Sequence, residues 1–339
     1  MGEFRSAGFG PRSAGESARS ADQALGCPFF SSLFFGQAKK RDLRAGQSPL
    51  SKSGARRRAH TKTSAPSGTS IKTRAPAAPY RTPKEPVENV FRSRNRTKPI
   101  VYHLRDVTRD RASEGVTFRL RVPSLQITQG EKIALIGESG CGKSTLLDML
   151  AFIAQPTDIA AFRFRPDEEN DAIDVAHLWK KRQMNQLGEL RKHHIGYVMQ
   201  TGGLLPYLTV RENMALSRSV LELPPDDTVD SLARELGIAR HLDKLPETLS
   251  VGERQRVAIG RALAHEPPIV IADEPTASVD PFAAEKIMSL FIGLAEERNI
   301  TVVVASHAWR HIKRLGLRRL AHHTHRSQDG RTTETVVNG

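Results

Sequence analysis

The 339-residue sequence has few cysteines and no long apolar run. Its two cysteines, Cys27 and Cys141, provide no disulfide framework, which fits a reducing compartment. The patch CPFFSSLFF, Cys27–Phe35, is too short to span a membrane, and no other stretch reaches the roughly 18 apolar residues of a transmembrane helix. No signal-peptide pattern opens the chain. These absences predict a protein without a membrane span of its own.

Charge is distributed unevenly along the chain. Residues 1–97 hold 19 Lys and Arg against 6 Asp and Glu, whereas the remaining residues hold 32 against 31. The sequence pI of about 10.1 therefore belongs to the first 97 residues, and it does not predict a nucleic-acid-binding protein. This segment is rich in Ser, Ala, Arg, Gly and Pro, a composition that cannot bury enough apolar surface to offset chain entropy. We expect 1–97 to be a disordered basic tail.

A phosphate-binding loop begins at Gly137. The segment GESGCGKST, Gly137–Thr145, matches the pattern G-x-x-x-x-G-K-[ST] and lies between a β-type run, Lys132–Ile136, and an apolar-periodic helix. The glycines let backbone N–H groups wrap a phosphate, and the helix directs its positive end at it. In this pattern Lys143 reaches the β- and γ-phosphates, and the Ser144 hydroxyl ligates Mg²⁺. The candidate nucleotide-binding residues are Gly137, Glu138, Ser139, Gly140, Cys141, Gly142, Lys143, Ser144 and Thr145.

An acidic pair follows a second strand of buried type. The run Ile269–Ala272 ends in Asp273 and Glu274. Acidic residues at the carboxyl end of a core strand lie where α/β sheets bind ligands. We expect Asp273 to hold Mg²⁺ through water and Glu274 to be the base or orienter of an attacking water. A surface acidic pair is the alternative, and the P-loop in the same chain disfavours it.

The stretch LSVGE, Leu249–Glu253, has the form of a helix start. Ser250 followed by Glu253 predicts a capping box. Gly252 stands inside the first turn, where glycine costs about 0.5–1 kcal/mol relative to alanine. That cost is explained if something approaches the backbone closely, and a helix N-terminus is a ready anion site. Because the P-loop already binds the phosphates of its own chain, we expect LSVGE to face the triphosphate of a second copy.

In this order, the motifs resemble those of the ATP-binding cassette (ABC) ATPases, from about Ile100 to Arg331. By this resemblance, Gln200 in IGYVMQ is the Q-loop glutamine, which senses Mg²⁺ and water and contacts the membrane partner. LSVGE is similar to the signature LSGGQ, which binds the γ-phosphate across a head-to-tail dimer. Asp280 in ASVD resembles the D-loop, and His307 in TVVVASHAW resembles the switch histidine that contacts the γ-phosphate.

The resemblance implies ATP as substrate, Mg²⁺ as cofactor and a set of site residues. The implied catalytic residues are Glu274, His307, Gln200 and Lys143, and the implied metal-binding residues are Ser144, Asp273 and Gln200. Ser250, Gly252 and Asp280 join the P-loop residues in binding the nucleotide.

Several positions depart from the family pattern. Val251 replaces the first signature glycine and Glu253 the glutamine; LSVGE…QR and LLPYLTVREN look most like the subgroup of lipoprotein-release and macrolide-exporter ATPases. The family usually stacks adenine on an aromatic residue upstream of the P-loop, and spacing disfavours both Tyr102 and Phe118. Clustered histidines favour basic surface segments over a metal site, since no Cys or carboxylate cluster joins them; they are His193, His194, His322, His323 and His325.

Alternating strand and helix signals predict an α/β fold with a mostly parallel sheet and helices on both faces. The resemblance specifies a P-loop NTPase, an ABC-type cassette with a RecA-like core sheet and an inserted helical subdomain. We expect the nucleotide-binding domain over 98–335 and the helical subdomain over about 203–257. The segment WKKRQMNQLGELRKHH is expected to form a core helix.

Three functions compete. The first is an ATP-hydrolysing subunit that powers transport by a separately encoded integral membrane permease, as a homodimer or heterodimer of cassettes held peripherally at the cytoplasmic face. The second is a soluble ABC ATPase that acts on nucleic acid or ribosomes, but the single P-loop and the absence of C-x-x-C motifs disfavour it. The third is a non-catalytic module whose basic tail is the functional part, which the complete set of motifs disfavours. We therefore expect transport, with no nucleic-acid partner.

Overall fold

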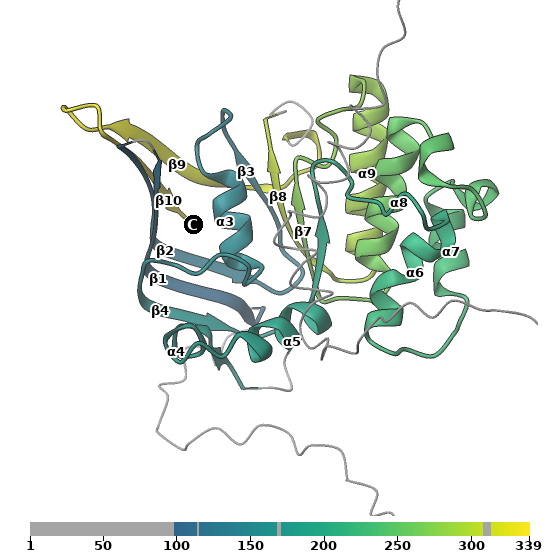
Figure 1. The fold of residues 1–339 in the computed structure, drawn as a ribbon, viewed down its shortest axis with the longest axis horizontal. Helices are drawn as coiled ribbons and strands as arrows, with labels where there is room; N and C mark the ends of the chain where they lie inside the picture. The colour runs from purple at the N-terminus through teal and green to yellow at the C-terminus, as the bar shows by residue number, and fades with distance from the viewer. Residues whose placement is uncertain (1–97, 114, 168–170, 308–312) are drawn as a thin grey trace, which may run out of the picture. The chain divides into compact units, whose positions relative to one another are not determined.

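The computed structural model describes residues 98–113, 115–167, 171–307 and 313–339 (Figure 1). The tail predicted over 1–97 lies outside the described residues. Within these ranges ten strands form one sheet in the order β5-β4-β1-β2-β10-β9-β3-β8-β7-β6. The strands are β1 Ile100–Ser113, β2 Val116–Thr128, β3 Lys132–Ile136, β4 Asp158–Phe164, β5 Ile173–Asp174, β6 Ile195–Val198, β7 Ile269–Asp273, β8 Thr301–Ser306, β9 Arg318–Arg326 and β10 Thr332–Asn338.

The sheet is mixed, whereas the sequence predicted a mostly parallel one. Strands β3, β8, β7 and β6 pair in parallel, and β9 joins β3 in parallel. At the other end β1 pairs antiparallel with both β2 and β4, and β9 pairs antiparallel with β10. Strand β10 continues to Asn338, beyond the domain boundary expected at residue 335. The parallel half therefore places the carboxyl ends of β3, β7 and β8 along one edge.

The helices are distributed over both halves of the sheet. Figure 1 shows α6, α7, α8 and α9 gathered beside the parallel strands, with α3 between the two halves. Helices α6, α7 and the start of α8 fall in the segment where a helical subdomain is expected. The bounds are α3 Lys143–Leu150, α4 Val175–Lys180, α5 Met184–His194, α6 Val210–Val220, α7 Thr228–Glu235, α8 Val251–Leu263 and α9 Pro281–Glu297, with 3₁₀ helices at Ala239–His241 and Pro246–Thr248.

Two apolar cores hold the parallel strands from opposite faces. In β8, Val302 and Val304 belong to the core under α6, α8 and α9, whereas Val303 and Ala305 belong to the core around α3. Successive residues of a strand point to opposite faces, so a strand buried on both faces reads as a continuous apolar run. The runs after Lys132 and from Ile269 in the sequence are of this kind, and they form β3 and β7.

The segment expected as one helix before β6 forms two. Helix α4 ends at Lys180, and α5 begins at Met184. Arg182 between them has φ 52°, in the left-handed region that an α-helix does not use. The Arg182 N–H donates to the carbonyl of Trp179, which closes a turn. The chain thereby changes direction before it enters β6.

Candidate nucleotide site

The P-loop wraps the N-terminus of α3. Gly142 precedes the helix with φ 91°, and Gly140 has φ 81°, so both stand where residues with a Cβ are strained. A Cβ at Gly142 would also lie 2.8 Å from Cζ of Phe118. The loop therefore needs glycine at Gly142 both for its backbone angle and for the close packing of Phe118.

Lys143 lies at the centre of this loop. Its Nζ donates hydrogen bonds of 2.9 Å to the carbonyls of Gly137 and Glu138, and it lies 3.2 Å from Oε1 of Glu274. The side chain is only 5% exposed. A buried ammonium with these partners gives the loop a fixed positive centre for a polyphosphate.

Asp273 ends β7 beside the Ser144 hydroxyl. Burial raises the pKa of Asp273, and a hydrogen bond with Ser144 opposes that rise. Among the described residues, Oδ1 of Asp273 is buried with no hydrogen-bond partner. A buried orphan oxygen needs an explanation, and an ion is one. Mg²⁺ is typically held by one or two carboxylates and phosphate oxygens, so Asp273 and Ser144 fit it.

Glu274 turns sharply out of β7 toward His307. Its φ of 44° is uncommon for a residue with a Cβ, and such backbone strain clusters at functional sites. The Glu274 N–H donates to the carbonyl of Ala305 at 3.0 Å, which fixes the turn against β8. Oε2 of Glu274 then lies 3.3 Å from Nδ1 of His307. The structure thus brings together two residues that the sequence only proposed as catalytic.

Helix α8 holds the segment that contains Gln200. Nε2 of Gln255 donates to the carbonyl of Gln200 at 3.0 Å. The guanidinium of Arg261 donates to the carbonyls of Gly202 and Gly203 at 2.8 and 2.7 Å. Neither residue was predicted from the sequence, although polar side chains on the inner face of an amphipathic helix were an available signal.

One hollow of about 480 Å³, which we name the P-loop hollow, collects eight of the sixteen predicted residues. Its lining combines residues of the P-loop with Gln200, Glu274 and three residues of β1 and β2. The lining residues are Arg111, Val116, Phe118, Ser139, Gly140, Gly142, Lys143, Ser144, Thr145, Gln200 and Glu274.

Ser250, Gly252 and Asp280 line a different hollow, of about 600 Å³, which we name the signature hollow. The predicted capping box is confirmed: Ser250 and Glu253 each bond the other's backbone N–H. Asp280 caps α9 by accepting from the N–H groups of Phe282 and Ala283. A Cβ at Gly252 would meet only ordinary contacts, the nearest at 3.6 Å on Ile287. Packing within the chain therefore does not require this glycine.

Comparison with known proteins decides the family. The ABC transporter family matches residues 120–277. The lipoprotein-releasing system ATP-binding protein LolD of Legionella pneumophila (strain Lens) is 36% identical over 200 residues, which cover 58% of this chain and 83% of LolD. The chain belongs to the ABC transporter family. It is an ATP-binding cassette of the ATPase type, as the resemblance in its motifs implied.

Other relatives agree with this placement of the cassette. The macrolide export ATP-binding/permease protein MacB of Rhodopirellula baltica is 39% identical over 191 residues, which cover 54% of this chain and 26% of MacB. The cassette thus spans about a quarter of that relative. The dimeric structure of MJ0796, a bacterial ABC transporter cassette, superposes with a TM-score of 0.54 at 31% identity and covers 62% of this chain and 90% of MJ0796. A post-hydrolysis dimer of MJ0796 bound to ADP and Pi gives 0.52 at 32% identity, covering 62% of this chain and 89% of MJ0796.

The clustered histidines of the cassette separate into distinct settings. Within the described residues no group of three or more His, Cys, Asp or Glu side chains is arranged to hold a metal ion. His325 pairs with Glu334 at 3.0 Å on the surface of β9. His322 instead lies under the P-loop, where its Nε2 is 2.7 Å from the Cβ position of Gly137. With Cys141, His323 and His307 it lines a third hollow of about 750 Å³, the histidine hollow.

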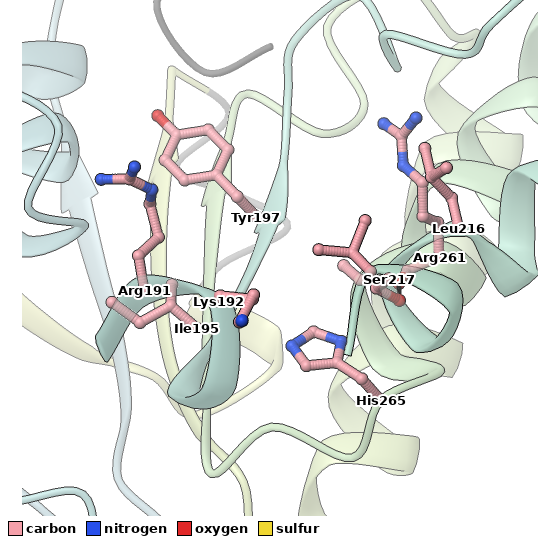
Figure 2. A pocket seen from close by; sticks show the side chains of 10 residues that line it. Arg191, Lys192, Ile195, Tyr197, Leu216, Ser217, Arg261 and His265 are labelled. Carbon is pink, nitrogen blue, oxygen red and sulfur yellow. Dashed lines mark hydrogen bonds between the residues drawn. The ribbon is translucent and has the colours of Figure 1, made fainter. Parts of the chain in front are cut away.

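A fourth hollow lies between α5 and β6 on one side and α6 and α8 on the other (Figure 2). Its volume of about 50 Å³ is far below the roughly 300–1,000 Å³ of small-molecule sites. Figure 2 shows the imidazole of His265 directed into the space between the two sides. Burial lowers the pKa of His265 to about 4. This hollow belongs to the packing of the cassette rather than to its nucleotide site.

Proposed function

We propose that this chain binds and hydrolyses ATP to power transport by a separately encoded membrane permease. The likeness to LolD supports a separate partner, because the chain covers most of that ATP-binding protein. The names of LolD and MacB, for lipoprotein release and macrolide export, support transport rather than action on nucleic acid or ribosomes. In the described residues, no helix has the length and apolar character to cross a membrane. The cassette would work at the cytoplasmic face, held there by its permease.

The hydrolytic roles follow from the groups that meet at Glu274. Lys143 and the backbone N–H groups of the P-loop bind the β- and γ-phosphates, with the ammonium fixed by the loop carbonyls. Ser144 and Asp273 would hold Mg²⁺, which when bound neutralises charge on the phosphates. Glu274 accepts a proton from the attacking water and orients it. His307, 3.3 Å from Glu274, holds that carboxylate in place and faces the γ-phosphate.

The separation of the two hollows is the observation that carries the proposed assembly. Ser250 and Gly252 line the signature hollow, and Lys143 lines the P-loop hollow. A helix N-terminus that binds the γ-phosphate must then belong to a second cassette, and MJ0796 is known as a dimer. Two copies placed head to tail complete two sites. Closure on ATP and reopening after hydrolysis would drive the permease.

A cross-linking experiment tests the partner. Tyr207 lies shortly after Gln200 in the chain and is 72% exposed. It is therefore a suitable position for a photo-reactive side chain in the full chain. Glu297, with a side chain 74% exposed at the end of α9, provides the control position. We expect Tyr207, but not Glu297, to cross-link to a multi-span membrane protein in native membranes. When that membrane protein is reconstituted in vesicles, it should stimulate ATP hydrolysis by this chain. An unchanged rate of ATP hydrolysis would reject the transport function.

A further inference from the structure

One end of the P-loop hollow is lined by residues that have no part in phosphate chemistry. Ser144, Gln200 and Glu274 form the hydrolytic end, whereas Arg111, Val116 and Phe118 come from β1 and β2. A nucleotide is one connected molecule, so its base and ribose must lie beside the phosphates. With the γ-phosphate at Glu274, the β1–β2 end of the same hollow remains for the base.

Arg111 and Phe118 form a directly opposed pair at that end. They face each other across the antiparallel β1–β2 ladder, which places both side chains on the same face of the sheet. Directly opposite residues have Cβ atoms about 4.5–5.5 Å apart, within reach of each other's side chains. The tip of the Phe118 ring packs against Gly142, at the N-terminus of α3. The pair therefore stands next to the phosphate cradle.

Arg111 differs from its neighbouring arginines in having its guanidinium available. Arg109, the preceding residue on the same face, donates to the carbonyl of Gln155, and Arg119 forms a two-bond pair with Asp110. Arg111 is exposed, and within the described residues no carboxylate forms an ion pair with it. A guanidinium is planar, always charged and stacks on aromatic faces. Purine bases offer such a face.

We infer that the base of the bound nucleotide stacks on the guanidinium of Arg111, with Phe118 as the wall that fixes its position. This inference rests on the proposed function, since it concerns the same ATP. It also answers what the sequence left open. Spacing disfavoured Phe118 as the stacking residue, and the structure gives that ring a supporting place beside an exposed cation. Every nucleotide base has a flat face that can stack on a side chain, and the loss of such stacking on substitution is large enough to measure.

Binding of two ligands to the full chain separates base from phosphate. We would titrate ATP and inorganic tripolyphosphate, both with Mg²⁺, into the wild type and three Arg111 variants. Arg111→Ala should weaken ATP binding about 10-fold while changing tripolyphosphate binding by less than about 2-fold. Arg111→Lys keeps the charge but not the plane, so it should behave like Arg111→Ala. Arg111→Tyr restores a flat ring and should bind ATP within about 3-fold of the wild type.

The controls make each outcome decisive. Arg121→Ala removes an exposed arginine from the opposite face of β2 and should change neither ligand's affinity. His323→Ala probes the histidine hollow and should do the same. If Arg111→Lys binds ATP like the wild type, or if His323→Ala alone weakens ATP binding, the stacking inference is overturned. A wild type that binds neither triphosphate would instead reject the proposed function itself.

Discussion

Nζ of Lys143 lies 3.2 Å from Oε1 of Glu274, so the P-loop ammonium and the carboxylate after β7 form an ion pair inside the site. Lys143 opens α3 after β3 and Glu274 follows β7, and these two strands are separated in the sheet only by β8. Oε2 of the same carboxylate lies 3.3 Å from Nδ1 of His307. One carboxylate thus lies between the P-loop ammonium and an imidazole, which supports the proposal that Glu274 is the base for an attacking water.

The first prediction concerns this carboxylate. Glu274→Gln keeps the shape of the side chain but cannot accept a proton, so ATP should still bind while turnover falls by about 100-fold or more. The variant should accumulate as a dimer in Mg-ATP, because reopening needs hydrolysis. Phosphate release and sedimentation measure both effects. Glu285→Gln, a surface carboxylate paired with Arg314, is the control and should hydrolyse ATP normally. Unchanged turnover in Glu274→Gln would contradict the assignment.

The parts of the site that follow a strand directly could be predicted from the sequence. Lys132–Ile136 and Ile269–Asp273 are short apolar runs, and the functional residues come immediately after them. The order of residues along the chain was therefore enough to locate the P-loop and the acidic pair at the ends of their strands. The capping box of Ser250 is likewise a contact across three residues, and it was confirmed.

Long-range contacts could not be predicted in this way. Arg261 reaches the carbonyl of Gly202 across 59 residues, and Phe118 of β2 packs on Gly142 at the start of α3. The run RRLAHHTHR shows little apolar alternation, since Leu320 is the buried apolar residue within β9. Periodicity therefore gave no signal that β9 joins the sheet beside β3, or that His322 lies under the P-loop.

The second prediction uses the cysteine of the P-loop. Cys141 is partly exposed in the histidine hollow, and its Sγ lies 2.6 Å from the Cβ position of Gly137. An N-ethylmaleimide adduct there would occupy space beside the loop backbone and block ATP binding. ATP added first should slow the loss of binding. Cys141→Ser should bind ATP and resist the reagent; if it is inactivated equally, the modified group lies elsewhere, with Cys27 the first to test.

The third prediction concerns stability below neutral pH. Burial lowers the pKa of His265 to about 4, whereas an unfolded chain has a histidine pKa near 6.5. The unfolded state therefore binds the proton first. The stabilisation is fully present above pH 6.5 and is lost as the pH falls toward 4. Between pH 7 and pH 5, this one group should lower the free energy of unfolding by on the order of 1–2 kcal/mol.

Urea unfolding at the two pH values measures this effect. His265→Asn cannot titrate, so its free energy of unfolding should fall less between pH 7 and pH 5 than that of the wild type. His323→Asn, on the exposed face of β9, should keep the wild-type pH dependence. An identical pH dependence in His265→Asn and the wild type would show that His265 titrates alike in both states.

The last prediction asks whether the signature hollow acts across a dimer. Ser250→Arg places a large side chain at the N-terminus of α8, where the N–H groups would face the partner's γ-phosphate. ATP should still bind to the P-loop of the monomer, but hydrolysis should be abolished. If Ser250 only caps α8, the result should differ. Loss of the cap would then cost about 0.5–2 kcal/mol of stability and leave turnover in the folded protein nearly intact.

Mixing two inactive chains separates these explanations. Ser250→Arg chains are combined with Lys143→Ala chains, and heterodimers are verified by differential tags. In a head-to-tail dimer, one composite site carries both defects and the other carries neither, so the mixture should regain ATPase activity that each variant lacks alone. Because the P-loop hollow and the signature hollow have no lining residue in common, each defect is confined to its own half of a site. Full activity of Ser250→Arg alone would show that Ser250 caps α8 and does nothing more.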